Sequence, residues 1–375
     1  RAATAAAREG LEDKAWWDAF LARAKELAPH LGLHDASLVL NGAARARRLD
    51  RGLVQALLPR LRTHLVYLTS AHLAMLASAI AKAEVHDPAF VELLTREVKA
   101  RLTEFHSPME LTMIVNAVSK LRVTDDELYR RMVTHMQSQM SHEHFHVRDL
   151  SVVVGALVRA GCMDAATMTR FADCALQTLP EATPLELSRL MHACMSTSCG
   201  AHDFYGACVL RSREQVLTMD PAGLASAAFA FGQCFETAQV EHLRYLRKVF
   251  KGIRLASVSA LPLFLPQDIS SLLRTYARWQ VSFPCAQLHR VADRMVATRH
   301  QFDTEGAVSA LYSMALLMQR NAVRTASAEA TEASWQAAEA AARHLLEPVW
   351  ASALAGELDV AALLRAVEAA AALRA

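Results

Sequence analysis

The sequence predicts an all-α fold, a right-handed α-solenoid of about eight helix-turn-helix repeats of roughly 38 residues with helical caps. Two observations predict it. Gly (13) and Pro (11) are both scarce, which favours helix over sheet. An apolar anchor followed six positions later by a small residue also recurs at intervals of 35 to 45 residues, which is typical of stacked arrays. The pairs are Leu38/Ala44, Leu73/Ala79, Leu111/Ala117, Leu150/Ala156, Leu187/Ala193, Leu224/Ala230, Ile269/Thr275 and Ala307/Ser313.

Each repeat is expected to be a helical hairpin. In the third repeat, Ser107-Pro108 provides an N-cap followed by proline at the first helical position, and a second helix start lies in 124–127 (TDDE). The small residue should let the next first helix approach closely, and neighbouring hairpins should complete the core. Similar starts recur at Thr69-Ser70, Thr183-Pro184, Asp220-Pro221 and Pro266 for first helices, and at Asp50, Asp87, Asp164 and Phe283-Pro284 for second helices.

Two segments depart from this pattern. Val152–Val154 is β-branched and would pass for a strand by itself, but the repeat phase predicts helix. The sixth repeat is longer, and an irregular insertion is expected around Ala256–Leu265. The predicted division is an N-terminal helical cap at 1–32, the repeat array at 33–320 and an Ala-rich C-terminal helical cap at 321–375.

Composition and charge indicate the cellular compartment of the protein and the kinds of partner that it can bind. The net charge of +2 argues against a polybasic nucleic-acid tail but allows a local basic groove. Seven scattered cysteines, an odd number, indicate reduced thiols in a non-secreted compartment. The apolar run Leu255–Leu265 is too short to span a bilayer, so no membrane insertion is expected. The opening RAATAAAR, which contains no acidic residue, is typical of the end of an organellar transit peptide.

Four segments carry a resemblance to a known family: SPMELTMIVNAVSKLRV, SAHLAMLASAIAKAEV, TPLELSRLMHACM and PQDISSLLRTYARWQV. They resemble the first helix of octotricopeptide repeats, and equally the heptatricopeptide and FAST-kinase-domain organellar repeats. The resemblance covers about Leu33 to Met318. It implies an organellar RNA-binding protein or a subunit of a divergent mitochondrial ribosome. Many family members carry a C-terminal RAP domain; the end of this chain is Ala-rich instead, which favours a binding or structural role.

A second regularity lies nine positions after each anchor, at Arg47, Lys82, Lys120, Arg159, Ser196, Gln233, Arg278 and Leu316. Five of these eight residues are cationic. Four residues earlier on the same helix face come, among others, Asn116, His192 and Arg274. Such a ribbon could bind RNA, with cations at phosphates and varied neighbours at splayed bases. The alternative is structural, because the helix macrodipole alone favours Lys or Arg in the last turn.

A basic stripe is a second RNA-binding candidate. Its members are spaced three or four residues apart, with no acidic residue after Glu241: Arg244, Arg247, Lys248, Lys251 and Arg254. A similar cluster in the first repeat comprises Arg45, Arg47, Arg48, Arg51, Arg60 and Arg62, interrupted by Asp50. A solvated helix face is the alternative explanation for both.

Metal and catalytic motifs are not expected. The group His192, Cys194, Cys199, His202 and Cys208 lacks the C-x2-C spacing of structural zinc sites. The histidines His142, His144 and His146 do not match H-E-x-x-H. The sequence contains no glycine-rich phosphate loop, nucleophile elbow or paired-carboxylate motif, so neither a cofactor nor enzymatic activity is predicted.

The predicted function is that of a helical-repeat RNA-binding protein of the mitochondrial matrix, in preference to the chloroplast. Within that class, a structural subunit of the mitochondrial ribosome is favoured, with rRNA or organellar mRNA and other proteins of a ribonucleoprotein complex as partners. The alternative, supported by the nearly neutral charge, is a protein–protein scaffold or accessory subunit of another mitochondrial complex without RNA contact.

Overall fold

The computed structural model describes residues 2–83, 85, 87–140, 145–324, 336, 338–347, 349, 366 and 368–370. Among these residues the chain is all-helical, with no strand, and its helices pack in neighbouring pairs as in an α-helical repeat fold. The β-branched Val152–Val154 lies inside a helix, as predicted. Packing within the repeat therefore prevails over the local β preference of that run.

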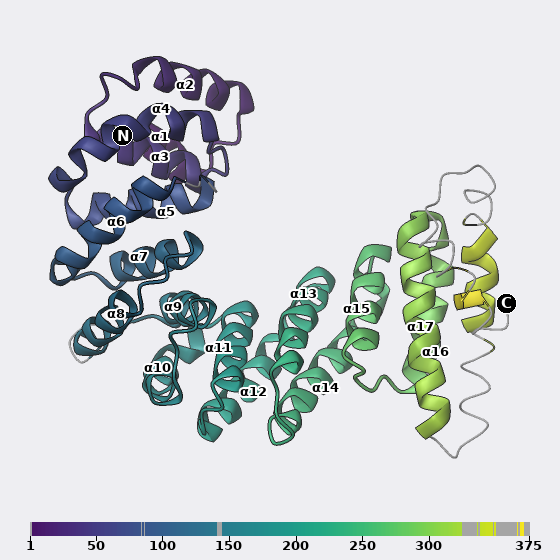
Figure 1. The fold of residues 1–375 in the computed structure, drawn as a ribbon. Helices are drawn as coiled ribbons and strands as arrows, with labels where there is room; N and C mark the ends of the chain where they lie inside the picture. Colours follow the sequence, from purple (N-terminus) through teal and green to yellow (C-terminus); the bar gives the residue numbers. More distant parts are fainter. Residues whose placement is uncertain are drawn as a thin grey trace. The chain divides into compact units, whose positions relative to one another are not determined.

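The chain divides into two compact units, Arg1–Glu181 and Ala182–Ala375. Figure 1 labels their helices. In unit 1 the hairpins are α1 (Ala2–Arg8) with α2 (Lys14–Leu27), α3 (Leu33–Arg45) with α4 (Arg51–His64), α5 (Ser70–Ala83) with α6 (Pro88–Ala100), α7 (Pro108–Lys120) with α8 (Asp126–Gln139), and α9 (Val147–Arg159) with α10 (Ala165–Thr178). The first helices α1, α3, α5, α7 and α9 pack on one another in that order.

Unit 2 follows the same plan. Its hairpins are α11 (Pro184–Ser196) with α12 (His202–Gln215), α13 (Pro221–Gly232) with α14 (Leu243–Ser259), and α15 (Pro266–Arg278) with α16 (Cys285–Ala297), followed by α17 (Thr304–Arg324). Here α11, α13, α15 and α17 pack on one another in sequence, and α12 packs on α14. The predicted C-terminal cap at 321–375 lies largely outside the described residues; within it, 338–347 are helical.

Many of the predicted helix starts are capped by side chains, whereas Ser107, the predicted N-cap of α7, makes no side-chain capping hydrogen bond. The carboxylates of Asp50, Asp87, Asp125 and Asp164 each accept a hydrogen bond from a backbone N–H in the first turn of the following second helix. At the start of α11, Thr183 and Glu186 form a capping box. The hairpins are therefore delimited by local side-chain chemistry that a sequence displays directly.

Several first helices end in the same Schellman motif. In each, a backbone N–H donates to the carbonyl five residues earlier: Leu11 to Ala6, Arg48 to Ala43, Val123 to Val118, Cys162 to Leu157, Cys199 to Cys194 and Val281 to Tyr276. The residue just before each donor has a positive φ: Gly10, Arg47, Arg122, Gly161, Ser198 and Gln280. This shared ending gives a structural register for comparing the repeats.

That register corrects the first predicted pair. In each of the first helices α5, α7, α9, α11, α13, α15 and α17, the anchor is the fourth residue of the helix and is buried. The small residue six positions later is buried too. In α3 the fourth residue is Ala36, which is 2% exposed, whereas Leu38 is only half-buried. The pair in α3 is thus Ala36/Gly42, because the close approach of α1 leaves room only for small side chains there.

The sixth repeat also differs from its prediction. Ala256–Ser259 continue α14 as regular helix, and the 3-10 turn at Leu261–Leu263 matches turns that follow α4, α10 and α16. The extra length lies instead in α14 itself and in the connection from α13, which includes a 3-10 turn at Gln233–Glu236. Residues 255–265 therefore form the end of a normal hairpin, in which Val258, Leu261 and Phe264 are buried and Leu255, Leu263 and Leu265 are exposed.

Candidate nucleic-acid interface

The first helices of unit 1 each carry one exposed cation at an equivalent place near the C-terminal end. Arg8, Arg45, Lys120 and Arg159 stand two residues before the left-handed residue of the Schellman motif, and Lys82 stands nine residues after its anchor Leu73. Packed helices lie about 8–10 Å apart. These five residues, which we name the unit 1 cation line, therefore follow one edge of the unit.

Electrostatic coupling shows that three members of the line are neighbours. Partial burial of the ammonium group lowers the pKa of Lys82, and the positive charges of Lys120 and Arg45 lower it further. Lys82 as a whole residue is exposed. Among the described residues, no carboxylate pairs with Lys82, Lys120 or Arg45 within 4 Å. The centre of the line is a like-charge cluster that a bound anion would relieve.

Hydrogen bonds to α7 hold the guanidinium of Arg159 in place. Its Nε donates to Ser119 Oγ at 3.2 Å, and its Nη2 donates to Asn116 Oδ1 at 3.1 Å. Ser119 Oγ in turn donates to the carbonyl oxygen of Ala156 at 2.9 Å. Arg159 thus lies over the helix that carries Lys120, and Asn116 has its amide fixed beside the line.

The predicted site residue Arg47 occupies a different position. It is the left-handed residue that ends α3, with φ 55°, two positions beyond the repeat cation Arg45. A hollow of about 520 Å³ at the ends of α1 and α3 is lined by both residues, together with Arg48 and Glu12. Arg47 therefore neighbours the line without belonging to it.

Sequence reasoning missed Arg8 and placed Arg45 only in a general basic cluster. Arg8 has no anchor nine positions before it within the sequence. Arg45 lies nine positions after Ala36, whereas the choice of Leu38 as the anchor pointed to Arg47 instead. The signal that finds both is the shared helix ending. Gly10 after Arg8 is the residue that most readily adopts a left-handed backbone, with φ 71°.

In unit 2 the corresponding residues are largely neutralised. Arg278 Nη2 pairs with Glu236 Oε1 at 3.1 Å, and its guanidinium lies 4.8 Å from the ring centre of Trp279. Burial lowers the pKa of His192, and the nearby Glu236 acts in the opposite direction. Arg274 is exposed on α15. Since Ser196 and Gln233 are uncharged, the first helices of unit 2 carry no continuous row of cations.

The predicted basic stripe lies on α14 with four exposed members: Arg244, Arg247, Lys248 and Lys251. Within the described part of the chain, none of the four pairs with a carboxylate at 4 Å or less. Arg254 differs, because it is half-buried, its Nη1 donates to the Ser282 carbonyl at 2.9 Å and burial lowers its pKa. We therefore define the α14 stripe by the four exposed cations.

The cysteine-rich group of unit 2 is a buried cluster. Cys194, Cys199, Cys208 and Cys234 are buried in the core, and none of the four forms a disulfide. A hydrogen bond with Cys199 and burial raise the pKa of Cys194, and burial raises that of Cys208. No three His, Cys, Asp or Glu residues in the described ranges are grouped so as to hold a metal ion. His142 and His144 lie outside those ranges, and His146 is an exposed residue 3.4 Å from Glu181.

No family model matches the chain, and a search of curated proteins finds no matching relative. None of the helices described has the length and apolar character needed to cross a bilayer. The function is therefore inferred from the residues of this chain and their arrangement.

Proposed function

We propose that this protein is a helical-repeat RNA-binding protein of the mitochondrial matrix, a structural subunit of the mitochondrial ribosome that contacts rRNA without catalysis. The fold in this proposal is a right-handed α-solenoid of about eight helix-turn-helix repeats of roughly 38 residues. The organellar and ribosomal context is supported by the resemblance of the first helices to organellar repeats and by the seven cysteines, none of which forms a disulfide.

The RNA-binding surface in this proposal is the unit 1 cation line. The observation that carries it is the position of Lys82 between Arg45 and Lys120, whose positive charges lower its pKa. The three residues lie on three consecutive first helices, and no carboxylate among the described residues pairs with them. Keeping like charges together is unfavourable unless a polyanion binds there. A helix macrodipole favours a cation at each of these helix ends, but it does not remove the effect of Lys120 and Arg45 on Lys82.

The mechanism is electrostatic. Cations about 8–10 Å apart can contact successive phosphates of one strand, releasing counterions as they bind. Asn116, whose Oδ1 accepts from Arg159, is placed to meet a base or a ribose beside the phosphates. Unit 1 therefore contributes most of the affinity, and the compensated residues of unit 2 contribute little.

The test is a binding titration of a fluorescein-labelled single-stranded RNA, followed by anisotropy over a range of salt concentrations. Each phosphate contact contributes a slope of about −0.7 in a plot of log affinity against log salt. The triple variant Arg45→Glu, Lys82→Glu, Lys120→Glu should flatten the slope by about 2 and weaken binding at least about 100-fold at low salt.

A matched control reverses three exposed arginines on the second helices of the same unit: Arg96→Glu, Arg131→Glu and Arg170→Glu. This control changes the net charge equally but leaves the line intact, so its affinity should stay within about threefold of the parent protein. Equal losses in the two variants would show that only net charge matters, and an unchanged triple variant would exclude the line as the contact surface.

The scaffold alternative is favoured by one specific observation, an exposed apolar groove in unit 2. Because the groove has a chemistry different from that of the cation line, the two can bind different partners on one protein.

A further inference from the structure

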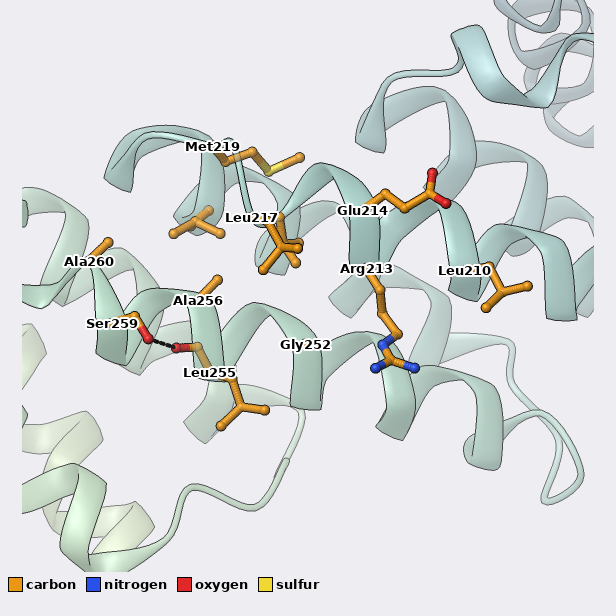
Figure 2. Close-up of a pocket in the computed structure, with 12 residues that line it drawn as sticks. Leu210, Arg213, Glu214, Leu217, Met219, Gly252, Leu255, Ala256, Ser259 and Ala260 are labelled. Carbon is orange, nitrogen blue, oxygen red and sulfur yellow. Dashed lines mark hydrogen bonds between the residues drawn. The ribbon is translucent and has the colours of Figure 1, made fainter.

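Two adjoining hollows lie between α12 and α14 in unit 2, with volumes of about 650 and 490 Å³. They share Leu210 and Arg213 from α12 and Gly252 and Leu255 from α14. Figure 2 shows the larger hollow, where Leu217, just beyond the end of α12, lies across from Ala256 of α14. Together the two hollows form one continuous groove along α14.

The groove has an unusually exposed apolar lining. Leu217 is 79% exposed, Leu210 62% and Leu255 46%. Exposed leucines are normal when scattered, but a contiguous group around a groove marks an interaction site. At Gly252 a Cβ would lie 3.4 Å from Arg213 Cγ, so the absence of a side chain leaves this part of the groove floor unfilled.

The rim of the groove is positive. Lys248 and Lys251 of the α14 stripe line the smaller hollow, and Arg213 lines both. Glu214 is the acidic residue in the lining, and its carboxylate already lies 3.3 Å from Arg211. Since α14 itself contains no Asp or Glu, the cations of the rim have charge available for a partner.

We propose that this groove binds an amphipathic α-helix of a partner protein, with apolar side chains on one face and Asp or Glu along its flanks. The lining residues of α14 and its C-cap run from Tyr245 to Ala260, roughly 22 Å at the helical rise, which fits a partner helix of about four turns. The leucines contact the apolar face, and Arg213, Lys248 and Lys251 contact the acidic flanks.

The apolar lining favours a protein helix over RNA on this surface. Leu210, Leu217 and Leu255 offer no hydrogen bond to a phosphate or a base edge. The one aromatic residue of the lining, Tyr245, is buried and already lies beneath the guanidinium of Arg244, which is 4.7 Å from its ring centre. The groove therefore lacks the open stacking platforms on which single-stranded RNA depends.

The experiment uses three synthetic fluorescein-labelled peptides and the full chain. The probe peptide places Leu at i, i+3, i+4 and i+7 over about four turns with Glu along the flanks. One control has Lys in place of Glu, and the other is a scrambled sequence of the same composition. The probe should bind at least about tenfold more tightly than either control in an anisotropy titration. Equal binding of all three peptides, or of none, overturns the proposal.

Variants then locate the binding. Leu217→Glu with Leu255→Glu should weaken probe binding at least about tenfold, and Leu263→Glu, a leucine that is 70% exposed outside the groove, should not. The double variant Lys248→Glu with Lys251→Glu should bind the Glu peptide more weakly and the Lys peptide more tightly than the parent protein does. These leucines are exposed, so folding of the variants is expected and is checked by circular dichroism.

A labelled single-stranded RNA provides the competing outcome. If RNA affinity falls about tenfold or more in Lys248→Glu with Lys251→Glu while probe binding is unaffected by the leucine variants, the surface binds nucleic acid and the proposal is wrong. This result is independent of the unit 1 cation line, since no residue of that line is altered.

Discussion

Gly42 of α3 lies directly against the backbone of Ala3 in α1, where a Cβ on Gly42 would come within 2.7 Å of the Ala3 carbonyl carbon. Real Cβ contacts are never that short, so any side chain at residue 42 must push α1 away from α3. Ala3 is fully buried in this contact. The first two hairpins therefore pack through backbone-to-backbone proximity that only glycine permits.

Gly42→Ala is accordingly expected to destabilise unit 1, although alanine favours a helix over glycine by about 0.5–1 kcal/mol. Overpacking costs about 1–3 kcal/mol and exceeds this gain. Gly155→Ala in α9 is the matched control, because a Cβ there meets nothing within 4 Å, and it should stabilise the protein. Urea denaturation measures both. A stability gain of equal size in the two variants would show that α1 does not press on Gly42.

Lys82→Met is expected to raise the folding stability of the protein while it lowers the affinity for RNA. The folded protein holds the pKa of Lys82 below its ordinary value of 10.5, so the unfolded chain takes up the proton more readily. The charged Lys82 therefore lowers the free energy of unfolding at neutral pH. This loss of stability diminishes only as pH rises from the folded pKa toward 10.5. Lys82 is exposed, so its removal should stabilise the protein by only a few tenths of a kcal/mol, and more at low salt.

The same Lys82→Met variant should bind RNA more weakly, because one phosphate contact is lost. Thermal unfolding at two salt concentrations and RNA anisotropy measure the two effects. Lys14→Met, at an exposed residue of α2, is the control and should change neither property. A variant that loses stability together with RNA affinity would indicate that Lys82 has a structural role.

His242 is expected to contribute to acid sensitivity in unit 2. It is buried, and its Nδ1 accepts the N–H of Gln239 at 3.1 Å. Burial lowers the pKa of His242 below 6.5. The nearby Glu241 raises this pKa, and His202 lowers it further. The unfolded chain therefore takes up a proton first as pH falls through 6.5, and stability decreases from there down to the folded pKa.

His242→Gln retains a hydrogen-bond acceptor but has no titration, so it should lose less stability than the parent protein between about pH 7.5 and about pH 5.5. Urea midpoints at the two pH values measure the difference. His300→Gln, at an exposed residue, serves as the control and should leave the pH dependence unchanged. If the pH dependence of His242→Gln matches that of the parent, another group causes the acid sensitivity.

Much of the fold was predictable because the signals are local. Asp87 and Asp125 cap the helices that follow them through hydrogen bonds spanning three residues, so a short sequence window reveals each start. The small residues Ala117 and Ala156 are buried where first helices pack, as their repeat position predicts. The α3 anchor was mispredicted because a local pattern prefers Leu38, the larger apolar residue, to Ala36.

The sequence by itself determined that the chain forms helical hairpins, where most of them begin, and that many first helices end with a cation. Only the tertiary structure decided which charges are neighbours. Arg278 is paired with Glu236, whereas Lys82 has Lys120 and Arg45 beside it. The physical reason is range: helix caps act within one turn of the chain, but charges interact through space across helices that lie about 40 residues apart in sequence.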